Sequence, residues 1–143
     1  MADPMGIDIE WNDALKLGFK PMDDQHERIV AIIAEIKLLL KDGSLAGSAL
    51  PKMHQLREEV LFHFDFEENL MAKYEYSGSF EDHRKAHKAA ISYINNALCS
   101  ADVAECTNIM ELFATTILDI IVRHDGDLVG SIIRSGNNII TDI

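Results

Sequence analysis

The chain of 143 residues has the length of one folded domain with a substantial core. Its 24 acidic and 13 basic residues give a formal net charge of -11, which disfavours nucleic acids and anionic membrane surfaces as partners. The first four residues lack the basic stretch and apolar run of a secretory signal, and no apolar run has the length of a membrane span. We therefore expect a single cytoplasmic domain over residues 1–143, and a monomer, because no apolar stripe is left over beyond the core faces.

The predicted elements are a non-helical arm over residues 1–20, which contains Trp11, and a four-helix bundle over residues 21–138. Apolar residues recur at three- and four-residue steps in four segments, which is the pattern of amphipathic helices. The first helix begins near residue 21 and ends at 42–44, and the second runs from about 51 to 72. The third runs from 80 to about 98, and the fourth carries its stripe from 109 to 128 and ends at 135–138. Short links between four helices predict an all-α, antiparallel up-down-up-down bundle.

Metal-ligand side chains lie on the inward face of every predicted helix. Two pairs stand at i,i+4 spacing, which places both members on one face of a helix one turn apart. Burial of unpaired imidazoles and of an unpaired carboxylate reduces the free energy of unfolding by roughly several kcal/mol. Divalent cations are partners that compensate this loss. His54 is interpreted as an ordinary, partly exposed histidine. The candidate ligands are His26, His63, Glu67, His83, His87 and His124.

The type of ligand favours iron over other metals. Five imidazoles with a carboxylate exceed the four positions of a structural zinc site, and the set lacks the thiolates of an iron–sulfur cluster. Two metals bridged by a carboxylate accommodate the whole set, and mixed nitrogen and oxygen donors suit iron better than magnesium or calcium. Ferritin-like di-iron bundles are richer in carboxylates, so the many histidines of this chain argue against that family.

Three sequence words make the chain resemble a bacterial hemerythrin: Asp-Asp-Gln-His at 23–26, His-Phe-Asp-Phe-Glu-Glu at 63–68 and His-Arg-Lys-Ala-His at 83–87. Their order and separation span almost the whole chain, and Trp11 stands in the expected arm. The resemblance implies two non-haem irons joined by an oxo or hydroxo bridge. It also implies that His26 and His63 hold one iron, that the other is held by His83, His87 and His124, and that Glu67 bridges them.

One position departs from the family pattern. The resemblance implies a second bridging aspartate five residues after the histidine of the fourth helix, but that position is Val129, which cannot bind a metal. Asp127 lies three residues after His124 on the same helical face, and Asp125 points about a quarter-turn away. Asp127 is the predicted replacement, Asp125 is the alternative, and Gly126 would give either one local freedom.

The resemblance implies reversible binding of dioxygen at an open position on the iron with two histidines, in a carrier, store or supplier of oxygen and not an enzyme. The alternatives are an oxygen or redox sensor with a separate partner, an enzyme acting on nitric oxide or peroxide, and an iron store; nitric oxide and small anions are further candidate ligands. An apolar wall around the iron would favour release of dioxygen. Its expected members are Trp11, Phe64, Phe66, Leu70, Phe113 and Ile121. Cys99 and Cys106 are too few for a disulfide framework and do not have zinc-site spacing, although they flank one link and a pairing between them stays open.

Overall fold

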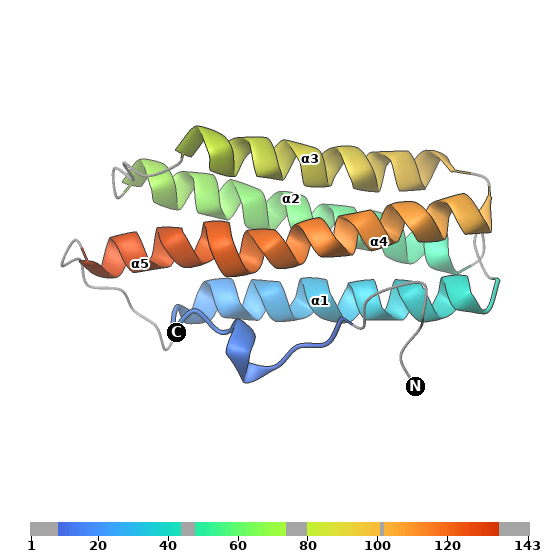
Figure 1. Ribbon diagram of the computed structural model, residues 1–143, viewed down its shortest axis with the longest axis horizontal. Helices are drawn as coiled ribbons and strands as arrows, with labels where there is room; N and C mark the ends of the chain where they lie inside the picture. The colour runs from blue at the N-terminus through green and yellow to red at the C-terminus, as the bar shows by residue number, and fades with distance from the viewer. Residues whose placement is uncertain (1–8, 44–47, 74–79, 101, 135–143) are drawn as a thin grey trace.

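The computed structural model describes residues 9–43, 48–73, 80–100 and 102–134, and Figure 1 shows their helices as rods that lie side by side with nearly parallel axes. The elements in chain order are η1 (Asp13–Leu15), α1 (Lys20–Lys41), α2 (Ala49–Lys73), α3 (Phe80–Cys99), α4 (Val103–Asp119), the π-helix η2 (Ile120–Asp125) and α5 (Gly126–Arg134). The last three form one continuous rod, which runs along the front of the view from the right to the left (Figure 1). The predicted all-α four-helix bundle is confirmed.

The rods form a closed ring of neighbours. Helix α1 packs against α2 and α4, and α3 packs against α2 and α4, so each rod contacts two others. Consecutive rods run in opposite directions, which is the arrangement of an antiparallel up-down-up-down bundle (Figure 1). Each helix therefore faces a shared interior, where side chains from all four rods meet.

The helix bounds differ from the predicted ones mainly at the start of the fourth rod. Helix α4 begins at Val103, six residues before the predicted stripe, because Asp102 caps it by accepting a hydrogen bond of 3.0 Å from the Ala104 backbone N–H. Helix α1 ends as predicted, and Gly43 there has φ +79°, a conformation that favours glycine. The predicted breaks at 76–79 and 135–138 lie outside the described residues.

The described part of the arm, residues 9–19, is fixed to the bundle by a buried carboxylate. Asp23 on α1 accepts hydrogen bonds from the backbone N–H groups of Leu17, at 2.8 Å, and Gly18, at 3.2 Å. Trp11 packs, partly buried, against the main core. These contacts hold the arm across the bundle near the N-terminal end of α1.

The apolar core consists of two clusters of buried side chains. The larger cluster fills the interior along most of α1, α2, α3 and α4. A smaller cluster lies toward the start of α1 and along α5, and its buried members are Phe19, Met22, Met71, Leu128, Val129 and Ile132. Buried histidines and carboxylates from the same helices are the polar exception in this interior.

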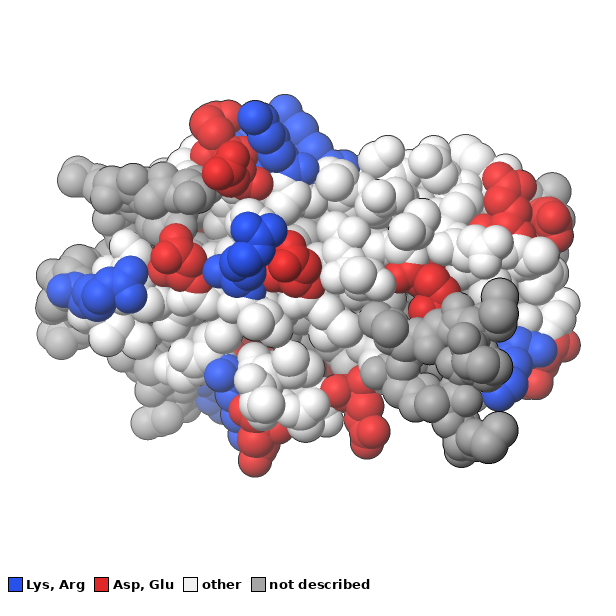
Figure 2. Space-filling view, viewed as in Figure 1, with Lys and Arg blue, Asp and Glu red and all other residues white. Residues whose placement is uncertain are grey.

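Basic and acidic side chains lie close together on the face seen in Figure 2, and neither sign forms a continuous patch there. Over the described residues, no helix is both long and apolar enough to cross a lipid bilayer.

Candidate metal centre

Six ligand-type side chains meet in the interior of the bundle, and none is more than 3% exposed. They come from α1, α2, α3 and η2, so every rod contributes. They form two groups that share two carboxylates, and the potential ligand atoms of each group lie within 4.8 Å of one another. The first group is His26, His63, Glu67 and Asp125, and the second is His83, His87, Glu67 and Asp125.

The first group joins α1, α2 and η2. The Nε2 atoms of His26 and His63 are 3.0 Å apart, and the His26 Nε2 lies 2.7 Å from Asp125 Oδ2. The His63 Nε2 lies 2.6 Å from Glu67 Oε1 and 3.2 Å from Asp125 Oδ2. Two imidazole nitrogens and two carboxylate oxygens therefore point at one place.

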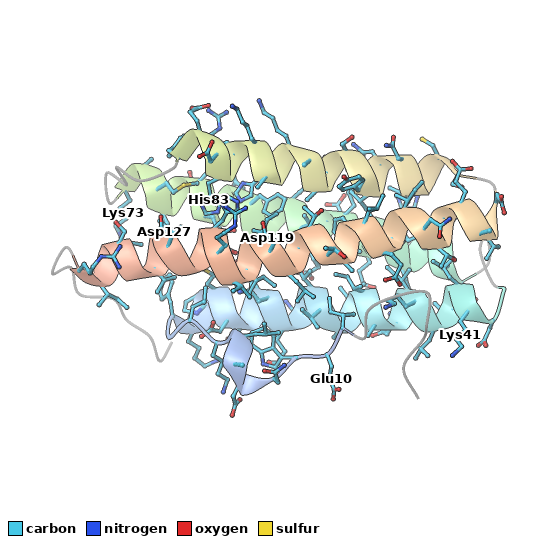
Figure 3. All side chains as sticks on the ribbon, in the orientation of Figure 1. Glu10, Lys41, Lys73, His83, Asp119 and Asp127 are labelled. Carbon is cyan, nitrogen blue, oxygen red and sulfur yellow. The ribbon has the colours of Figure 1, made fainter. Side chains whose placement is uncertain are left out.

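The second group joins α2, α3 and η2. The His83 Nε2 lies 2.9 Å from Asp125 Oδ1 and 3.2 Å from Glu67 Oε2, and the His87 Nε2 lies 3.6 Å from Glu67 Oε1. Figure 3 shows His83 directed from α3 into the space between the rods. Asp125 presents one oxygen to each group and Glu67 contacts histidines of both groups, which is the arrangement of two bridging carboxylates.

Neighbouring side chains orient two of the imidazoles from behind. The Gln25 Oε1 lies 2.6 Å from His63 Nδ1, and the Glu68 Oε2 lies 3.1 Å from His87 Nδ1. An acceptor at Nδ1 places the proton there and leaves the Nε2 lone pair directed into the site. Phe64 stacks on His87 with ring centroids 3.8 Å apart and an interplanar angle of 8°, which fixes the plane of that ring.

The charges of the site perturb one another strongly. Burial lowers the pKa of His63 and of His83, but the carboxylates of Glu67 and Asp125 outweigh it and raise these pKa values to about 10 and about 9. Burial raises the pKa of Asp125, but its interactions with Glu67 and with the imidazoles of His26, His63 and His83 lower it well below the usual carboxyl value. Without a metal, protonated imidazoles compensate the buried carboxylates.

The donor set fits a pair of metal ions. Both oxygens of Glu67 and the Nε2 of His87 are fully buried, yet no well-directed hydrogen bond to the described part of the chain satisfies them. Such atoms are rare in protein interiors, and ligation of a cation would satisfy all three. Four imidazoles with two carboxylates are the mixed nitrogen and oxygen donors that suit iron.

The structure brings together five of the predicted ligands and leaves two outside the groups. His26, His63, Glu67, His83 and His87 meet as expected from their i,i+4 pairs and inward faces. His124 is buried with its ring centroid 5.4 Å from that of His83, but it belongs to neither group.

Asp125, and not the predicted Asp127, lies in the two groups of ligand-type side chains. Asp127 is exposed on α5, and Figure 3 shows it nearer than His83 to the α5 end of the bundle. The physical reason is the π-helix Ile120–Asp125, which changes the register in which a side chain faces the interior. The predicted freedom of Gly126 is not used, since its φ of -61° and ψ of -41° are ordinary helical values.

The sequence held only a weak signal for Asp125. Steps of three and four along the last rod fit Asp125, between Ile121 and Leu128, but they fit His124, between Ile120 and Leu128, equally well. The expected aspartate was placed at 127 and not at 125, because His124 was taken as the ligand from which the spacing was counted. Gln25 and Glu68 stood inside the recognised sequence words, but no spacing identified them as partners of histidines.

The expected apolar surroundings are present in part. Phe64, Phe113 and Ile121 are buried, whereas Trp11, Phe66 and Leu70 are partly buried against the two clusters. On the outer side of Phe64 and His87, a groove of about 350 Å³ opens between α2 and α3.

The cysteines do not pair. Cys106 is buried with its Sγ 3.7 Å from the Sδ of Met53, Cys99 is exposed, and both are free thiols. Burial, with a smaller effect of Glu105, raises the pKa of Cys106, so this thiol is not activated.

Comparison with known proteins agrees with this geometry. A family model described as the hemerythrin HHE cation binding domain matches residues 17–126. A myohemerythrin from Sipunculus nudus is 27% identical over 128 residues, which cover 90% of this chain and 100% of that protein.

Two bacterial relatives match over a shorter stretch. A bacteriohemerythrin from Pseudomonas aeruginosa is 32% identical over 89 residues, and one from Pseudomonas paraeruginosa is 34% identical over 92 residues. Each match covers 61% of this chain and 56% of the relative. No solved structure matches the chain significantly. Because the family model covers most of the bundle and ends just beyond Asp125, the chain belongs to the hemerythrin HHE cation binding domain family.

Proposed function

We propose that the chain binds dioxygen reversibly at a buried pair of non-haem iron ions. The observation that carries this proposal is the convergence of four imidazole Nε2 atoms on two shared carboxylates in a fully buried layer. The names of the relatives, a myohemerythrin and bacteriohemerythrins, support the same function. The bound iron pair supplies the redox chemistry that holds dioxygen and returns it unchanged.

The proposed ligands divide between the two irons according to the groups. His26 and His63 would hold one iron, His83 and His87 would hold the other, and Glu67 and Asp125 would be shared by both. Four protein donors would leave further positions on each iron for small ligands, since iron commonly takes more than four donors.

The surroundings of the site favour binding over chemical turnover. The phenyl ring of Phe64 stacks on His87, and Phe113 and Ile121 are buried in the same apolar core, so apolar side chains shield this side of the site. A dry site withholds the protons that reduction of dioxygen consumes, and this supports use as a carrier, store or supplier of oxygen and not as an enzyme.

Anaerobic addition of ferrous iron to the metal-free protein, followed by oxygen uptake at a gas electrode, tests the proposal. Saturation at two irons per chain, uptake of one dioxygen per iron pair and its return under vacuum are expected. Iron uptake far beyond two would indicate an iron store instead. Consumption of dioxygen without return would indicate a sensor or an enzyme, and nitric oxide removal without oxygen would point to the enzyme.

A further inference from the structure

The last rod presents no histidine to the metal groups. In the described part of the chain, Asp125 is the single residue of α4, η2 and α5 that joins either group. His124 precedes Asp125 directly, and neighbouring residues on a helix point in different directions. Its ring centroid is 5.4 Å from that of His83 with the planes tilted by 37°, beside the ligand sphere and not within it.

The residue five positions before Asp125, at the start of the π-helix, is apolar. A π-helix closes its backbone hydrogen bonds over five residues, so residues five apart lie about one turn from each other on one side. The residue five before Asp125 is Ile120, which is 1% exposed and has no donor atom. The family spacing of histidine and aspartate therefore fits Ile120 and Asp125 here, with the histidine replaced.

We infer that this chain holds both irons with the same donor set, two imidazoles and two shared carboxylates each. His124 is not a ligand, and Ile120 closes the place where the second iron would take a third imidazole. The two iron positions are then nearly equivalent, and small ligands have access to coordination positions on both. This inference rests on the proposed iron pair.

Iron stoichiometry separates this inference from the proposed function. We expect two irons per chain in the unaltered protein and in His124→Gln after anaerobic loading and desalting, and about one fewer in His87→Gln. Circular dichroism establishes that each variant is folded. Fewer than two irons in the unaltered chain would overturn the proposed function, whereas loss of iron in folded His124→Gln would overturn only the present inference.

Mössbauer spectroscopy of the di-ferrous protein loaded with ⁵⁷Fe tests the equivalence directly. Overlapping quadrupole doublets are expected for the unaltered chain and for His124→Gln, and two well-separated doublets of equal area would overturn the inference. Ile120→His is expected to split the signal and to slow removal of one iron by a chelator, with Ile121→His as the matched control. An unchanged spectrum in folded, iron-loaded Ile120→His would contradict the assignment of position 120.

Discussion

Asp125 connects the two halves of the metal centre. Its Oδ2 lies 2.7 Å from His26 Nε2, and its Oδ1 lies 2.9 Å from His83 Nε2, on opposite sides of the bundle. The carboxylate is completely buried, so its charge is compensated within the site. Removal of this group leaves Glu67 as the one carboxylate shared by the two groups of ligand-type side chains.

Asp125→Ala is expected to lose at least one iron per chain, because both metal groups include its carboxylate. Asp127→Ala, two residues away on the exposed surface, is the matched control and is expected to retain both irons. Iron is measured colorimetrically after anaerobic loading and desalting. Full iron content in Asp125→Ala together with loss in Asp127→Ala would show that the bridging aspartate is the one first predicted from the sequence.

The side chains of Gln25 and Glu68 fix the orientation of two histidine rings. Gln25→Leu and Glu68→Ala each remove an acceptor from the Nδ1 of a proposed ligand, and about a 10- to 100-fold loss of metal affinity is expected for either. Glu58→Ala serves as the control, because Glu58 is exposed and lies on α2 with Glu68. Competition with a chromophoric chelator measures the affinity, and equal values for all three variants would refute the orienting role.

At the scale of the element, the π-helix determines which side chains of the last rod face inward. Sequence periodicity predicted all four rods. It also predicted the inward faces of α2 and α3, whose ligand pairs stand at i,i+4 spacing, and that of α1, where His26 lies on a regular apolar stripe. It did not predict the break in helical register at Ile120–Asp125, since no proline or glycine within that segment marks it. A π-helix depends on tertiary packing and on the polar groups that it serves, and both are visible only in the folded chain.

Two glycines allow a test of the local backbone. Gly126 has ordinary helical angles, and a Cβ there would meet the Leu17 side chain at 3.8 Å, a normal contact. Gly126→Ala is therefore expected to raise the free energy of unfolding by about 0.5–1 kcal/mol. Gly18 has φ +90°, so Gly18→Ala is expected to lower it by about 1–2 kcal/mol.

Urea denaturation of the metal-free variants provides the measurement for both glycines. Destabilisation by Gly126→Ala would mean that residue 126 needs backbone conformations that alanine does not readily adopt, which would contradict the helical angles described for it. A neutral Gly18→Ala would mean that the arm is not held in the described conformation.

At the scale of the whole molecule, buried charge makes the metal-free fold dependent on pH. The pKa of His63 is raised from 6.5 to about 10 and that of His83 to about 9, so their stabilising contribution is complete below pH 6.5 and is lost as the pH rises through these values. The pKa of Asp125 is lowered below 3.8, so its contribution is present above that pH and is lost in stronger acid.

The urea midpoint of the metal-free protein is thus expected to be highest between about pH 4 and 6.5 and to fall steadily from pH 7 to 10. His63→Gln should flatten part of that alkaline fall, while His54→Gln, at an exposed position, should leave it unchanged. A midpoint that stays constant or rises from pH 7 to 10 would contradict the ion pairs described for the site.

The four rods together enclose a metal centre that each rod alone cannot form, and reversible dioxygen binding is the central claim about the whole molecule. Its most direct test is the visible absorption spectrum of the anaerobic di-ferrous protein, recorded before oxygen, after oxygen and after oxygen is removed. A band that appears with oxygen and disappears on its removal, through repeated cycles, is the predicted result. Direct and irreversible conversion to a ferric spectrum would contradict it.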